Sequence, residues 1–234
     1  MNLADLRSPE LIKNIGHLLL AVPLGATEQH GPHLPLDTDT VIAMELCRRV
    51  AEHRPDTVVA PPISYGSSGE HSDFPGTLSI GQSATQLLLT ELVRSADRFR
   101  GVVIVNGHGG NLEPLRAATR TLRTEGRKVL TWSPSGLPDD SHAGHRETSV
   151  MLHLRPTRVA TRLAHAGNTQ PLSEIIDRLR QHGLAAVSRN GVLGDPTHAS
   201  ADAGPRSWMR GPAIFSRSLL DTARPRATRR NEML

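Results

Sequence analysis

Short apolar runs alternate with helical patterns along this chain, beginning at Leu18. The runs cover about Leu18–Leu24, Thr57–Ile63, Val102–Val105 and Lys128–Trp132. Runs that are continuously apolar are typical of strands covered on both faces. Because strands that alternate with helices form mainly parallel sheets, we expect an α/β protein with a mainly parallel sheet between helices.

Helical patterns fill the intervals between these runs and continue after them. The expected helices cover about Thr40–Glu52, Ser83–Phe99, Leu112–Glu125, a segment that begins within 142–149 and includes Leu154, Pro171–Gln181 and Pro212–Thr222. We find no internal repeat and no composition shift that would mark a domain boundary. A chain of 234 residues is therefore expected to form a single domain over 1–234.

The segment after the first run is rich in side chains that bind metals. It carries two imidazoles and three carboxylates between Glu28 and Asp39. If the chain is still extended there, Glu28 and His30 lie on one side, about 6–7 Å apart. Asp39 follows after a loop. A solvated polar loop is the plain alternative, because Glu-x-His alone is a weak signal.

The third run leads directly into the turn Asn106-Gly107-His108-Gly109-Gly110-Asn111. A turn between a strand and a helix lies at the carboxyl edge of the sheet, where open α/β sheets bind ligands. Glycines on both sides of His108 allow backbone to approach a ligand closely. The turn lacks the Lys-Ser/Thr and the glycine spacing of nucleotide-binding loops, so nucleotide binding is the weaker interpretation. Asn111 stands where an N-cap would.

A third loop contributes His142 and Glu147, so three loops bring ligand-type side chains to one predicted edge. Carboxylates and imidazoles without thiolates suit zinc, manganese, iron or cobalt. Five or six ligands exceed the usual number for one catalytic ion. With one bridging carboxylate they would suit two ions about 3.5–4 Å apart, which activate water and polarise a carbonyl or phosphoryl oxygen. His33 and His145 could either support the ligands or be structural.

Charge and composition exclude several classes of protein. The formal charge is +4, and much of the excess lies in a basic tail from about residue 224, which we expect to be mobile. Aromatic residues are only 3% of the chain, so no stacking platform for nucleic acid accompanies these arginines. The single cysteine, Cys47, permits a reducing compartment. Without a signal pattern or a membrane-spanning run, we expect a soluble, cytoplasmic protein.

Four segments, in this order along the chain, together resemble the creatininase (creatinine amidohydrolase) family. They are 28–35, Phe74-Pro75-Gly76-Thr77, 106–111 and 142–149. The resemblance implies a three-layer α/β/α fold, a two-metal amidohydrolase site and a homohexamer. By position it implies four metal ligands and a proton donor. The ligands are Glu28, His30, Asp39 and His108, with Asp39 bridging, and the candidate proton donor is His142.

One departure from the family pattern concerns the second metal. Creatininase itself has a glutamate two residues after the histidine of the Gly-His turn, where this chain has Gly110. We expect Glu147 to fill the missing place, as a metal ligand within the catalytic centre.

Further similarity narrows the expected substrate. The segments 64–71, 142–145, 185–188 and 191–197 resemble the subgroup of mycofactocin precursor peptide peptidases. This implies hydrolysis of a peptide bond in a modified ribosomal peptide, releasing its C-terminal piece. Alternatives with the same chemistry are a creatininase and a deformylase of a pyrimidine intermediate. A two-metal phosphoesterase is the alternative from another class. Phosphate sites usually recruit Arg or Lys, but the segments 28–35, 74–77, 106–111 and 142–149 contain only Arg146. A non-catalytic scaffold is the last alternative.

Overall fold

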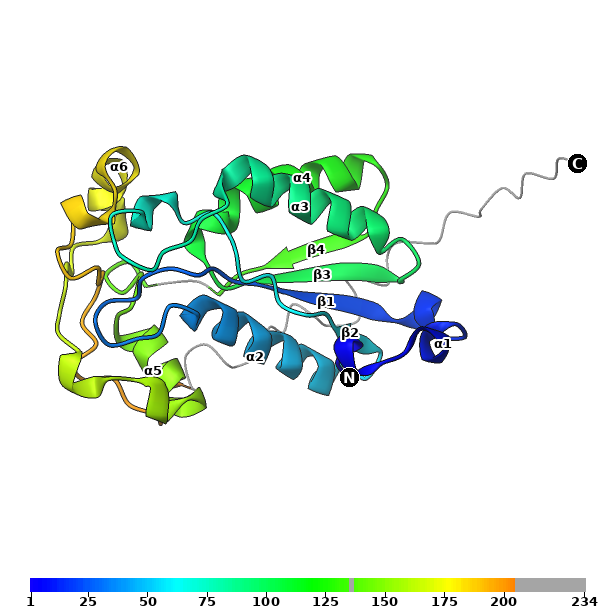
Figure 1. Cartoon of the computed structure of the whole chain (residues 1–234), viewed down its shortest axis with the longest axis horizontal. Helices are drawn as coiled ribbons and strands as arrows, with labels where there is room; N and C mark the ends of the chain where they lie inside the picture. Colours follow the sequence, from blue (N-terminus) through cyan, green and yellow to red (C-terminus); the bar gives the residue numbers. More distant parts are fainter. Residues whose placement is uncertain (135–136, 205–234) are drawn as a thin grey trace, which may run out of the picture.

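The computed structural model describes residues 1–134 and 137–204 (Figure 1). The expected helix near Pro212–Thr222 and the basic tail lie outside the described residues.

Four parallel strands form one sheet, in the order β2-β1-β3-β4. The strands are β1 (Leu19–Leu24), β2 (Thr57–Val59), β3 (Gly101–Asn106) and β4 (Val129–Trp132). In the central pair, Leu19 lies beside Gly101 and Leu24 beside Asn106, so β1 and β3 end side by side. All carboxyl ends therefore meet at one edge, on the left in Figure 1. The predicted parallel sheet is confirmed.

The second strand is shorter than its apolar run predicts. Regular pairing ends at Val59, and Ile63 returns only as a single bridge to Leu24. Pro61 and Pro62 lie between them and have no backbone N–H to donate to the neighbouring strand. The prediction of one strand to Ile63 is wrong for this reason.

Helices cover both faces of the sheet. In Figure 1, α3 (Gly81–Ser95) and α4 (Leu112–Thr124) lie on one face, and α2 (Thr38–His53) and α5 (His145–Leu154) lie on the other. Alternation along β3 divides the core accordingly, because Val103 and Val105 pack with α2 and α5 while Ile104 packs with α3 and α4. The three-layer α/β/α prediction is confirmed.

Two further α-helices lie near opposite ends of the sheet. The helix α1 (Ser8–Leu11) lies near the amino-terminal end of the sheet, and α6 (Leu172–His182) lies beyond its carboxyl edge (Figure 1). A small apolar cluster of Ile175, Leu184 and Leu193 holds α6 and the loops around it. None of the described helices is both long and apolar enough to cross a bilayer.

Two glycines bring the amino end of α2 against the strand ends. A Cβ on Gly25 would lie 2.4 Å from Thr40 Oγ1, and a Cβ on Gly107 would lie 2.5 Å from the carbonyl oxygen of Asp39. No side chain fits at either position without moving α2. Because neither glycine has a side chain, the first turn of α2 can carry Asp39 to the carboxyl edge of β1 and β3.

Candidate metal centre

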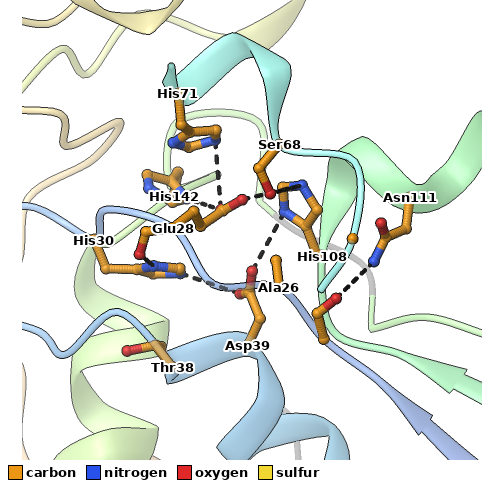
Figure 2. Close-up of polar contacts among 12 residues, drawn as sticks. Ala26, Glu28, His30, Thr38, Asp39, Ser68, His71, His108, Asn111 and His142 are labelled. Carbon is orange, nitrogen blue, oxygen red and sulfur yellow. Dashed lines mark hydrogen bonds and ion pairs between the residues drawn. The ribbon is translucent and has the colours of Figure 1, made fainter. Parts of the chain in front are cut away.

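The structure brings all six expected site residues together at the carboxyl edge of the sheet, each at most 9% exposed. They come from the loop after β1, the first turn of α2, the turn between β3 and α4, the loop before α5 and the first turn of α5. Figure 2 shows four imidazole rings arranged around the carboxylates of Glu28 and Asp39. Parallel strands place the loops that follow them side by side, which explains why distant motifs meet here.

Asp39 has a different imidazole on each side of its carboxylate. Its Oδ1 lies 3.1 Å from His30 Nε2, and its Oδ2 lies 3.3 Å from His108 Nδ1. Two groups of potential ligand atoms include this residue, and within each group the atoms lie within 4.8 Å of one another. The groups are Glu28, Asp39 and His108, and His30, Asp39 and Glu147. Two groups with one shared carboxylate have the layout of a pair of adjacent cations.

The unpartnered oxygens of these carboxylates fit cations. Among the described residues, both carboxylate oxygens of Glu28 and Oδ2 of Asp39 are buried without a hydrogen-bond donor. A buried polar atom without a partner costs free energy, which a coordinated cation would offset. The donor set contains no thiolate, because Cys47 of α2 is buried in the apolar core. The residues present therefore fit divalent transition-metal ions.

Burial and neighbouring charges change the pKa values of the ligands strongly. Burial raises the pKa of Glu147 to about 7 and raises that of Glu28. Burial by itself would lower the pKa of His30, but the charge and hydrogen bond of Asp39 raise it to about 10. These protons are held in the absence of a cation, and a bound metal ion would displace them.

His142 lies beside the same carboxylates as a neutral imidazole. Burial lowers its pKa well below the ordinary range, and the positive charge of His30 lowers it further. Its Nδ1 lies 3.8 Å from Glu28 Oε1, and its Nε2 lies 3.0 Å from the carbonyl oxygen of Gln29. A neutral imidazole in this position can accept a proton and deliver it again.

Comparison with known proteins identifies the family. The family model for creatininase, described as creatinine amidohydrolase, matches residues 4–210. The chain belongs to the creatininase family. It is 54% identical to the mycofactocin precursor peptide peptidase of Mycolicibacterium smegmatis over 195 residues, which cover 80% of this chain and 78% of the relative. The creatinine amidohydrolase of Pseudomonas putida is 33% identical over 175 residues, covering 62% and 67%.

Solved creatininase structures share the fold. A mutant creatininase superposes with a TM-score of 0.73 at 28% identity, covering 87% of this chain and 91% of the other. Two further structures, a creatininase described as the Mn form and a mutant described as the Zn-Zn type, give TM-scores of 0.71 and 0.70. This chain is therefore an amidohydrolase of the creatininase family, and its buried centre lies at the edge where the sheet binds ligands.

The surroundings of Gly110, where the sequence departs from the family pattern, leave no space for a side chain. A Cβ there would lie 2.2 Å from the carbonyl oxygen of Ser67, 2.4 Å from His108 Nε2 and 2.5 Å from Glu70 Oε1. No side chain can occupy this position. Glu147 of α5 lies at the centre, with its Oε2 3.9 Å from His30 Nε2.

Three residues near the centre were not predicted as part of the site. They are Gln29, Glu70 and His71. His71 Nε2 lies 3.4 Å from Glu28 Oε1, and its ring centroid lies 4.6 Å from that of His142. Glu70 Oε1 lies 3.7 Å from His108 Nε2. For Glu70 and His71, the available signal was the length of the irregular connection after β2, since such loops are often functional, but length alone does not place a side chain.

Other polar candidates lie outside the ligand groups. His33 Nε2 lies 2.8 Å from Thr148 Oγ1, and burial lowers the pKa of His33 to about 4, as expected for a structural imidazole. His145 begins α5 and belongs to no ligand group among the described residues. Asn111 is the residue before α4, but its side chain makes no capping bond and donates to the carbonyl oxygen of Gly25 instead.

Proposed function

We propose that this chain is a metal-dependent peptidase that hydrolyses a peptide bond in the modified mycofactocin precursor peptide and releases its C-terminal fragment. The substrate rests on one observation, the 54% identity over 80% of the chain to a relative with that name. The chemistry rests on the buried centre, in which two candidate ligand groups share Asp39.

We assign Glu28, Asp39 and His108 to one divalent ion, and His30, Asp39 and Glu147 to a second. Zinc, manganese and iron all suit carboxylate and imidazole donors. When bound, such ions lower the pKa of a coordinated water and polarise the carbonyl of the amide.

Side chains of the protein supply the proton transfer and hold the groups that carry it out. His142 moves a proton at Nδ1 and gives it to the departing amine, a general-acid role that typically contributes 100- to 10,000-fold. Glu147 also orders the turn that carries this imidazole, because its Oε2 accepts a 2.6 Å hydrogen bond from the backbone N–H of Ala143. Ala143 has a φ of 52°, a conformation that costs a non-glycine residue free energy, and this bond helps to hold it.

The proposed assembly is a cytoplasmic homo-oligomer, a hexamer by family resemblance. Light scattering coupled to gel filtration should then give a mass of several chains of 25.3 kDa, six for a hexamer, and the mass of a single chain would contradict it.

The function is tested by mass spectrometry of the modified precursor peptide incubated with zinc-loaded protein. We expect release of a C-terminal fragment, and no turnover of creatinine, a pyrimidine formamide or a phosphomonoester in parallel reactions. The His142→Ala variant should keep its metal and lose about 100- to 10,000-fold in rate. The exposed His153→Ala serves as the matched control with full activity.

The parallel substrates separate the alternatives. Turnover of creatinine alone would retain the chemistry and remove the peptide substrate. Turnover of the phosphomonoester alone would overturn the assignment as an amidohydrolase.

A further inference from the structure

Gln29 stands between the candidate ligands Glu28 and His30 in the sequence and contacts two other imidazoles of the site. We propose that Gln29 is a positioning residue that fixes which ring nitrogen of His71 and which ring nitrogen of His142 face the site. Its side chain makes His71 present an N–H to Glu28, and its backbone carbonyl makes His142 present a bare nitrogen to the site. This inference rests on the proposed function and adds His71 to it.

The amide of Gln29 is held in one orientation. The backbone N–H of Gly31 donates a 2.8 Å hydrogen bond to Gln29 Oε1, which identifies that atom as the acceptor. The Nε2 atom lies 3.0 Å from the carbonyl oxygen of Gly191. A Cβ on Gly191, whose φ is +74°, would lie 2.1 Å from Gln29 Oε1. The amide therefore fits only against a glycine.

A count of donors and acceptors then decides where the hydrogens lie. Gln29 Nε2 carries two hydrogens, and the Gly191 carbonyl can only accept, so one hydrogen remains. Two imidazole nitrogens lie within its reach, His71 Nδ1 at 3.1 Å and His142 Nε2 at 3.0 Å.

The backbone carbonyl of Gln29 resolves this choice. It can only accept, and His142 Nε2 lies 3.0 Å from it. All of these groups are paired only if His142 Nε2 donates to this carbonyl and the remaining amide N–H donates to His71 Nδ1.

The two imidazoles thus have the same tautomer but face the site with different ring nitrogens. A neutral imidazole carries one ring hydrogen, so both rings hold it on Nε2. In His71 that hydrogen faces Glu28 Oε1, 3.4 Å away. In His142 the bare Nδ1 faces the same oxygen from 3.8 Å. One ring therefore presents an N–H toward a ligand carboxylate, and the other presents a nitrogen that can take a proton.

Contacts of this kind affect metal centres measurably. Groups that hydrogen-bond to metal ligands orient them, and their loss typically costs 10- to 100-fold in metal affinity or activity. Gln29 holds His71 through Nδ1 and so sets which ring nitrogen lies 3.4 Å from Glu28 Oε1.

The test is nitrogen NMR of zinc-loaded protein with ¹⁵N-labelled histidine, because the chemical shifts of the ring nitrogens report which one is protonated. His71→Gln and His142→Gln assign the two signals. We expect Nε2 to carry the hydrogen in both rings of the unsubstituted protein.

Gln29→Glu is the decisive variant. A carboxylate cannot donate to His71 Nδ1, so the hydrogen of His71 should move to Nδ1. His142 should not change, because its partner is a backbone carbonyl. The matched control is Gln82→Glu at an exposed position of α3, which should change neither ring.

Gln29→Met, which is uncharged and similar in length, provides a second variant if the carboxylate prevents folding. It should abolish the preference of His71 for Nε2–H, leave His142 unchanged and weaken zinc binding by about 10- to 100-fold in a chelator competition. A His71 ring that keeps its hydrogen on Nε2 in both variants would overturn the inference. Failure to cleave any peptide would overturn the proposed function and leave the NMR result standing, so the two are distinguishable.

Discussion

At the scale of single residues, Asp39 connects the two halves of the centre. Its two oxygens lie 3.1 Å and 3.3 Å from imidazole nitrogens of His30 and His108, which belong to different ligand groups. Interactions of Asp39 with these two imidazoles lower its pKa despite burial, so the carboxylate is ionised and ready to coordinate.

Asp39→Ala should therefore remove both metal ions, because each ion loses a shared ligand. Elemental analysis of the purified variant measures this directly. Asp37→Ala is the matched control: it removes a carboxylate two positions earlier that pairs with Arg158 on the surface, and it should retain both ions. Full occupancy in Asp39→Ala would show that this carboxylate does not bridge.

At the scale of elements, the turn between β3 and α4 places two adjacent glycines in very different surroundings. A Cβ on Gly110 would lie 2.4 Å from His108 Nε2, whereas a Cβ on Gly109 would meet nothing within 4 Å. Only one of the pair is needed for the close packing of this turn against the loop that carries Ser67.

Gly110→Ala should displace His108 and weaken zinc binding by about 10- to 100-fold, the usual effect of disturbing the support of a metal ligand. Gly109→Ala should bind zinc as the unsubstituted protein does. Chelator competition on both variants provides the comparison. Equal zinc affinities for the two alanine variants would contradict this prediction, because the turn would then accept a Cβ at position 110 without displacing His108.

At the scale of the whole molecule, the buried ionisable groups make the stability of the folded protein depend on pH and on metal binding. The pKa of His30 is raised from an ordinary value of about 6.5 to about 10 by Asp39, in spite of burial. A raised pKa means that the folded protein binds this proton more tightly than the unfolded chain. Its contribution to stability is therefore complete below about pH 6.5 and is lost as the pH rises through about 10.

Metal-free protein should accordingly lose stability as the pH rises across this window, as measured by urea unfolding after chelation. His30→Gln should flatten the dependence. Zinc-loaded protein should behave in the opposite way between about pH 6 and 8, since the metal binds deprotonated ligands and stabilises the folded state. Metal-free protein that becomes more stable over the same range would contradict the assigned origin of the shift.

The sequence by itself determined the parallel sheet, the edge at which the site lies, and the six residues brought together there. These follow from local patterns: continuous apolar runs indicate buried strands, and parallel strands present their following loops at a common edge. The motif order was enough to indicate the family, because it depends on residue types along the chain and needs no knowledge of distances.

Only the tertiary structure decided which side chains complete the centre and which space is available to them. His71 and Gln29 lie 42 positions apart in the sequence yet are 3.1 Å apart in the fold. The need for glycine at position 110 arises from Ser67 and Glu70, which a different loop brings to the turn. Contacts between loops depend on how each irregular backbone packs, and no periodic pattern encodes that. Such contacts can be identified only in the folded structure.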